Sequence, residues 1–217
     1  MDHQTIQKRK IKRTALKLFL NNGYSKTTTR EIADACEINK GTLHYYYNQK
    51  ENIAFELYED FVRGIISYLG SRYSATPSGL SMVALMNMLF YKVLGSDEKY
   101  VDCLSDILST QRLAYMKIRK SVESCLDFVD HTDEDTLTVA MTVTIGAESQ
   151  LLYGIQLGTL HMSYAELPAF VERIFLKSLD IGEEESEDII RCATEECDSI
   201  NTRDVLDYLI RINDWDG

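Results

Sequence analysis

The stretch TTREIADACEINKGTLHYYY, residues 28–47, decides the fold of the N-terminal part of the chain. Thr28 and Glu31 have the spacing of a capping box, in which each side chain accepts from the other residue's backbone N–H, so a short helix is predicted to begin here. Asn39, after a brief turn, is a good N-cap for a second short helix that reaches Tyr47. Two short helices joined by about three residues have the build of a helix-turn-helix.

The second of these helices is predicted to present a face that suits DNA. Leu43 and Tyr47 share one side by their i, i+4 spacing, and at about 100° per residue three consecutive tyrosines cannot all point inward. A backbone glycine permits close approach to the duplex, a threonine can meet a base edge, and tyrosine hydroxyls can reach phosphates. The expected DNA contacts are Thr28, Thr29, Arg30, Lys40, Gly41, Thr42, His44, Tyr45, Tyr46 and Lys50.

Packing or solvation alone could also explain several of these residues. Arg30, Lys50 and the basic cluster at residues 8–17 contact phosphate in one interpretation and are merely solvated in the other. His44 is expected to form hydrogen bonds and not to ligate a metal, because no second ligand is near it.

Charge is distributed unevenly along the chain. The 217 residues carry a net charge of −11, which by itself argues against binding to phosphates. Residues 1–50, however, hold 10 Lys/Arg against 4 Asp/Glu, a net +6, while residues 51–217 hold a net −17. A basic head on an acidic body would turn one end toward a polyanion.

An amphipathic helix should precede residue 28, with Ile11, Ala15 and Phe19 on one face and a C-cap at Gly23. The segment from Ala15 to Ile53, ALKLFLNNGYSKTTTREIADACEINKGTLHYYYNQKENI, resembles the signature of the TetR family of bacterial transcriptional regulators. The resemblance implies a homodimer, a double-stranded DNA operator with an inverted repeat, and a small-molecule effector that releases a repressor.

Two positions depart from the family pattern. Glu37 stands in the turn where glycine is common, and glutamate tolerates a positive φ less readily than glycine does. His44 stands where tyrosine is usual, so the base preference of this chain is expected to be its own.

The remaining sequence predicts an all-α protein, with a three-helix head at 1–49 and a larger helical bundle at 50–217. Only 2 prolines and 11 glycines occur, and apolar residues recur at spacings of three and four. After a long helix from Lys50 toward Tyr73, the segment 75–79 should be a break. Further helices are predicted at 80–94, 97–108, 111–129, 134–160, 164–179, 184–198 and 203–212, the acidic 183–198 segment having a solvated face.

The body is expected to bind the effector and to dimerise. Aromatic and Met side chains of the kind that line apolar pockets, with the lone charge of the apolar 134–160 helix, predict a site for a small apolar or amphipathic effector. These residues are Tyr68, Met86, Phe90, Tyr91, Tyr115, Glu148 and Tyr153; core packing explains most of them equally well.

A row of small residues on the 134–160 helix, with the helix after it, would form the dimer interface implied by the resemblance. The expected interface residues are Ala147, Leu151, Gly154, Gly158, Phe170 and Ile174. The alternative is that both helices pack only within the monomer.

Other functions find less support. The first residues are polar, so no signal peptide is expected, and no segment sustains the ~18 apolar residues of a membrane span; the chain is expected to be cytoplasmic. The five cysteines form no CxxC pair and are expected to be reduced and mostly buried. No catalytic, metal or cofactor motif occurs, which disfavours a helical enzyme subunit. A constitutive DNA-binding or adaptor protein without an effector remains the main alternative.

Overall fold

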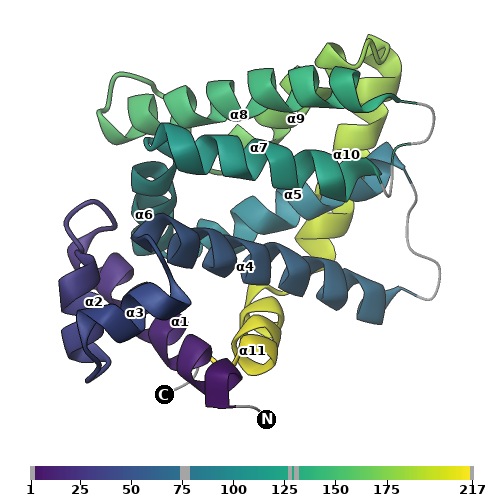
Figure 1. The fold of residues 1–217 in the computed structure, drawn as a ribbon. Coiled ribbons are helices and arrows are strands. Elements are labelled where there is room, and N and C mark those ends of the chain that lie inside the picture. Colours follow the sequence, from purple (N-terminus) through teal and green to yellow (C-terminus); the bar gives the residue numbers. More distant parts are fainter. Residues whose placement is uncertain (1–2, 74–78, 127–128, 130–131, 216–217) are drawn as a thin grey trace.

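The computed structural model describes residues 3–73, 79–126, 129 and 132–215, and this part of the chain is entirely helical and irregular, without strands. The predicted all-α fold is therefore confirmed (Figure 1). The helices are α1 (His3–Asn22), α2 (Thr29–Ala35), α3 (Lys40–Tyr46), α4 (Lys50–Arg72), α5 (Leu80–Leu94), α6 (Glu98–Leu108), α7 (Gln111–Leu126), α8 (Glu134–Gln156), α9 (Leu167–Ser178), α10 (Glu183–Ser199) and α11 (Thr202–Asn213).

Helices α1–α3 form the head at one end of the molecule (Figure 1). Their apolar faces meet in a small core that contains Ile11, Phe19, Ile32 and Leu43. α1 ends as predicted, because Gly23 adopts φ +88 and donates its N–H to the carbonyl oxygen of Phe19 at 3.0 Å.

The long helix α4 joins the head to the body. Ile53, Ala54 and Leu57 in its first turns are buried in the head core, whereas Ile65 and Leu69 belong to the body core. A change in the direction of α4 would therefore be felt in both parts.

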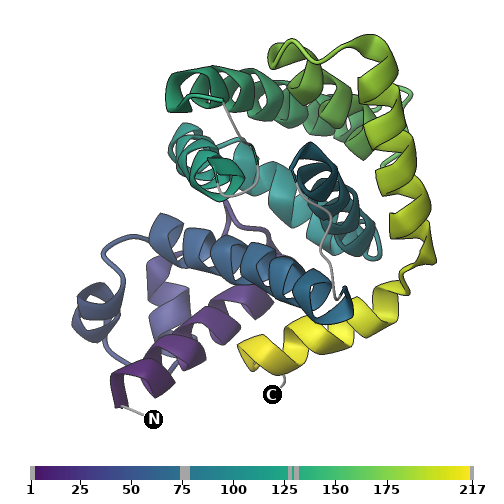
Figure 2. The ribbon, with the colours of Figure 1, turned by 90° about the vertical axis from the view of Figure 1, so that its right-hand side faces the viewer.

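The body packs around α5, which is buried over most of its length. α8 and α9 lie side by side on the face opposite the head, and α10 runs down the flank toward α11 (Figure 2). α10 turns Ser186, Ile190, Ala193 and Cys197 inward. Most of its carboxylates stay exposed, as the charge pattern predicts.

Three predicted boundaries need comment. The helix expected at 134–160 ends at Gln156, because Gly158 is left-handed at φ +66 and the N–H groups of Thr159 and Leu160 bond back to the Gly154 carbonyl. The helix expected at 111–129 ends at Leu126, and residues 127–128 lie outside the described part. The expected break at 75–79 also falls mostly outside it; Gly79 is described and precedes α5.

The C-terminal helix α11 returns to the head (Figure 2). It packs against α4 so closely that a Cβ at Gly64 would stand 2.2 Å from Leu209 Cδ2. Asp214, just beyond α11, pairs with Arg9 of α1 at 3.8 Å. Head, α4 and C-terminus are thus in mutual contact. Within the described residues, no helix combines the length and apolar character needed to cross a membrane.

Candidate nucleic-acid interface and body cavities

The two short helices of the head begin at side-chain caps. Thr28 Oγ1 accepts from the Glu31 N–H at 3.2 Å, and Glu31 Oε2 accepts from the Thr28 N–H at 2.7 Å. Asn39 Oδ1 accepts from the Thr42 N–H at 2.7 Å. The predicted capping box and the predicted N-cap of α3 are both confirmed, and they fix the residues at which the two helices begin.

The turn between α2 and α3 keeps a left-handed residue without glycine. Glu37 adopts φ 56, and the Ile38 N–H bonds to the Ala33 carbonyl at 3.0 Å. Glu37 therefore adopts the left-handed conformation that glycine would take more readily, and the backbone carries strain at Glu37.

Helix α3 is held from one side and exposed on the other. Leu43 and Tyr47 are buried, and the Tyr47 hydroxyl donates to Glu56 Oε2 at 2.7 Å. Lys40, Gly41, His44 and Tyr45 are exposed; Thr42 and Tyr46 are half-buried.

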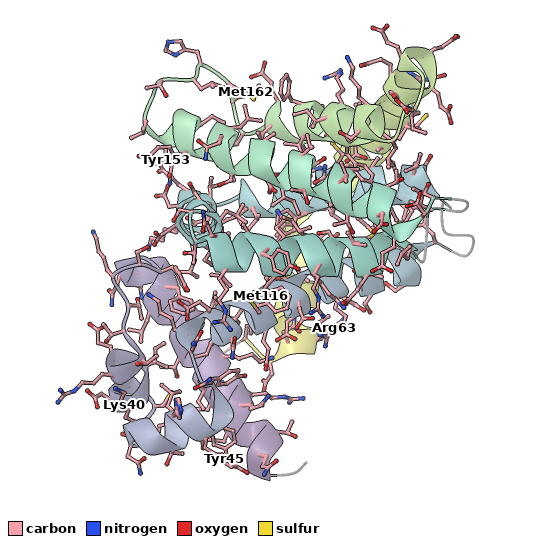
Figure 3. All side chains as sticks on the ribbon, turned by 45° about the horizontal axis from the view of Figure 1, so that its top comes forward. Lys40, Tyr45, Arg63, Met116, Tyr153 and Met162 are labelled. Atoms are coloured by element: carbon pink, nitrogen blue, oxygen red, sulfur yellow. The ribbon has the colours of Figure 1, made fainter. Side chains whose placement is uncertain are left out.

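Lys40 and Tyr45 lie at the end of the molecule away from α8 (Figure 3). Tyr45 is 71% exposed and packs edge to face with Tyr46 at 5.2 Å between ring centroids. An exposed aromatic pair beside a lysine suits contact with a nucleic-acid backbone.

Near the start of α2, Thr28 and Arg30 are exposed and Thr29 is half-buried. Arg30 reaches only its neighbour Asp34, at 3.9 Å between exposed groups. Such a pair is weak, so the guanidinium is available to phosphate.

Lys50, unlike Arg30, is not free to contact phosphate. Its Nζ donates to the carbonyl oxygens of Tyr24 at 2.7 Å and Thr27 at 2.9 Å, and it lies 4.3 Å from the centroid of the Tyr24 ring. The ammonium is occupied inside the head, so the expected phosphate contact of Lys50 is corrected to a structural role.

Part of the N-terminal basic cluster is occupied in a similar way. Lys8 pairs with Glu56 at 3.2 Å, and Lys12 pairs with Asp60. These ion pairs join α1 to α4, and sequence spacing alone could not indicate them because the partners are 48 residues apart.

The body contains a buried charged pair. Lys117 of α7 donates to both carboxylate oxygens of Glu148 of α8, at 2.6 and 2.5 Å, and the Tyr91 hydroxyl donates to the same carboxylate. Burial, followed by the charge of Glu148, raises the pKa of Tyr91 well above its usual range. The tyrosine therefore stays a hydrogen-bond donor.

Two cavities flank this pair. The junction cavity, about 290 Å³, lies between α1 of the head and helices α4, α6 and α11, and its lining includes Leu16, Phe55, Leu104 and Trp215. The body cavity, about 120 Å³, lies among α4, α5, α7, α8 and α9. Tyr58, Phe90 and Lys117 line both cavities.

The expected effector residues do not all gather in one place. Met86, Phe90 and Glu148 line the body cavity, and Tyr91 contacts it through Glu148. Tyr68 instead packs edge to face against Tyr208.

Tyr115 is 65% exposed and Tyr153 is 53% exposed; neither lines the two cavities, so their expected effector contacts are corrected (Figure 3 shows Tyr153). Helical periodicity left both facings possible. Sequence reasoning also missed Lys117 and Glu172, because a lysine on a polar helix and a glutamate beside an arginine look like surface residues.

Sequence similarity to known proteins is strongest in the head. The sequence profile described as "Bacterial regulatory proteins, tetR family" matches residues 11–57. The HTH-type transcriptional regulator QacR of Staphylococcus aureus is 46% identical over 50 residues, which are 23% of this chain and 27% of QacR. The biofilm operon icaADBC HTH-type negative transcriptional regulator IcaR of the same species is 32% identical over 96 residues, 43% of this chain and 50% of IcaR.

The N-terminal part of the chain is thus similar to regulators of the TetR family. The matches span about a quarter of QacR and half of IcaR. A crystal structure of Thermus thermophilus FadR, a TetR-family transcriptional repressor in complex with lauroyl-CoA, superimposes with a TM-score of 0.52 over 81% of this chain and 96% of FadR. At 16% identity this likeness concerns the fold alone.

Apolar side chains are exposed on α8 and α9. Val139, Val143, Tyr153 and Leu157 repeat along one side of α8 and are 50–62% exposed, and Phe170 on α9 is 42% exposed.

The row expected from small residues lies elsewhere. Gly154 is buried against Leu160, Gly158 is beyond the helix, and Ala147, Leu151 and Ile174 are only half-buried. The expected interface residue Gly154 is corrected because the turn after Gln156 folds back over it, and Gly158 is part of that turn and not of the helix face.

Metal-binding clusters and cysteine thiols bear on other chemistry. No cluster of His, Cys, Asp and Glu among the described residues could hold a metal ion. The cysteines are free, and burial raises the pKa of Cys103 and of Cys125 to about 12, which keeps these thiols protonated and unreactive. Cys192 is the exposed one.

Proposed function

We propose that this chain is a transcriptional repressor that binds an inverted-repeat DNA operator as a homodimer and is released by a small-molecule effector. The observation that carries the proposal is the geometry of α3: Leu43 and Tyr47 bury one side in the head, and Lys40, His44 and Tyr45 remain exposed on the other. The names of its relatives QacR and IcaR support the same function for a head of this sequence.

A homodimer would form through the exposed apolar side of α8 and α9. Residues such as Val139, Val143 and Phe170 are costly to leave in water, and a two-fold interface would cover them on both copies. This face lies on the side of the body away from the head (Figure 1), which leaves both heads free to enter successive major grooves about 34–36 Å apart.

The body cavity is the proposed effector site. A cavity beside α4 supports an effector-dependent repressor over a constitutive DNA-binding protein, since a completely filled body would have no place for a ligand. α4 runs from the head to this cavity, and the junction cavity leaves space beside it. An effector that prefers a shifted α4 would change the spacing of the heads, whereas one with equal affinity for both positions would change nothing.

The operator claim is tested by a gel-shift with purified dimer and inverted repeats from upstream of its own gene, at moderate salt. Specific retardation that survives excess unrelated DNA is expected, and Lys40→Ala with His44→Ala should weaken it. If a dimeric, folded protein shows no preference for any such repeat, the proposed function is wrong.

A further inference from the structure

Two glutamates line the body cavity from the neighbouring helices α8 and α9, and both are 2% exposed. Glu148 on α8 is fully compensated, since it receives Lys117 on both oxygens and the Tyr91 hydroxyl. A buried carboxylate with such partners is ordinary structural chemistry.

Glu172 on α9 has no such compensation. Its Oε2 accepts from Asn87 Nδ2 at 2.8 Å, while its buried Oε1 has no hydrogen-bond partner. Among the described residues no cation lies within salt-bridge distance of it: the adjacent Arg173 points outward to Glu187, and Lys120 at the cavity pairs with Glu59 and Glu123. Leaving a buried carboxylate oxygen unpaired is unfavourable unless something else supplies a donor.

We propose that the body cavity binds a small primary or secondary amine, whose ammonium group donates to Glu172 and whose apolar part fills the cavity. The inference rests on the effector role proposed for this cavity and names the chemical class of the ligand. Glu148 and Lys117 cancel each other, so the ionised form of Glu172 gives the cavity one uncompensated negative charge. A monovalent cation balances it, and a carboxylate or phosphate ligand would be repelled.

The cavity also sets how such an amine would lie. The Lys117 ammonium at the α7 side repels a second cation, which places the ligand nitrogen at the Glu172 end near Asn87. Its apolar part would then contact the side chains of Val83, Met86, Met141, Ile145 and Phe175. A volume of about 120 Å³ is somewhat smaller than the cavity of about 150 Å³ known to hold benzene, so the apolar part of the ligand is limited to about one ring.

Calorimetric titration of the full chain at pH 8 with benzylammonium chloride, toluene and benzoate tests the proposal. Benzylammonium should bind at least about tenfold more tightly than toluene, which has the same ring but no donor, and benzoate should not bind. Equal affinities for benzylammonium and toluene, or no binding of benzylammonium at millimolar concentration, would overturn the proposal.

Glu172→Gln provides the second arm, and Glu187→Gln, the same change at the exposed glutamate that pairs with Arg173, is its control. Glu172→Gln should lose the preference for benzylammonium over toluene, with circular dichroism showing that the helices persist, while Glu187→Gln should keep it. An unchanged preference in Glu172→Gln contradicts the assignment. The titrations of the wild-type protein with the three ligands test the proposal even if either variant fails to fold.

The gel-shift separates the two proposals. If the amine fails to bind but the operator is bound specifically, only the ligand class is wrong. If no operator is bound, the repressor function is wrong whatever the amine does.

Discussion

Lys50 Nζ lies 2.7 Å from the carbonyl oxygen of Tyr24, although the two residues are 26 positions apart. The contact ties the first residue of α4 to the loop between α1 and α2. It occupies the ammonium group of Lys50, which the sequence predicts to contact a DNA phosphate. Lys40, by contrast, is exposed at the start of α3. These two lysines should therefore respond differently to substitution.

Lys50→Met is expected to lower the free energy of unfolding by about 1–3 kcal/mol, because it leaves carbonyl oxygens without their charged donor. Lys40→Ala should leave stability nearly unchanged, weaken operator binding and reduce the slope of log affinity against log salt by about 1. Chemical denaturation and salt-dependent gel-shifts measure both. A reduced salt slope in Lys50→Met at full stability would restore its role as a phosphate contact.

Substitutions on α3 should distinguish residues that contact DNA from residues that pack in the core. Thr42→Ala and Tyr45→Ala are expected to lower operator affinity with little change in melting temperature, since Tyr45 is 71% exposed. Leu43→Ala, at a position that is 1% exposed, should destabilise the protein by about 2–5 kcal/mol. If Tyr45→Ala unfolds the head, the assignment of its outward face is wrong.

Glu37→Gly should raise the stability of the head, by up to about 1 kcal/mol, because glycine removes the strain of a side chain at φ 56. Asp34→Gly is the matched control: it places glycine in α2, where the helical backbone gains nothing and stability should fall by about as much. Thermal melting of the two variants checks this. A lower melting temperature for Glu37→Gly would show that its side chain contributes more than the strain costs.

Val143→Glu is expected to dissociate the proposed homodimer and weaken operator binding, because it places a charge in the exposed apolar side of α8. Monomer stability should hardly change, as Val143 is 50% exposed. Tyr115→Glu, an exposed aromatic on α7, is the control and should leave sedimentation unchanged. A Val143→Glu protein that sediments as wild type argues against this interface.

Stability should fall as the pH rises from about 5 to 8. Burial raises the pKa of Glu172 from 4.5 to about 7, so in this window the folded protein binds more protons than the unfolded chain and each pH step favours unfolding. The loss is at most about 3 kcal/mol at one residue. The same cavity is lined by other titratable side chains that face Glu172 from the helices around it: Tyr58, Lys117, Lys120, Cys125 and Glu148.

Glu172→Gln is expected to flatten this decline, as seen in denaturation midpoints across the pH range. An identical decline in both proteins would mean that Glu172 is not the titrating group. Bound benzylammonium should flatten the wild-type decline as well, since it stabilises the ionised carboxylate.

The sequence alone predicted the head because local rules determine it. Capping side chains three residues from their backbone partners, such as Thr28 with Glu31 and Asn39 with Thr42, act within one helical turn and can be identified without a structure. Amphipathic spacing likewise predicted that Leu43 and Tyr47 are buried. The all-α class followed from the same periodicity over the rest of the chain.

Tertiary structure alone decided which charged side chains are paired inside the protein and which remain free to contact a partner. The partners of Lys50, Lys12 and Glu148 are between 23 and 57 residues away, and no spacing rule connects them. The turn after Gln156 covers Gly154, and the larger side chains of α8, such as Val139 and Val143, are the exposed ones. The role proposed for Glu172 also depends on the tertiary structure. Its carboxylate oxygen Oε1 is buried without a hydrogen-bond partner, and the sequence does not show which partners a side chain lacks.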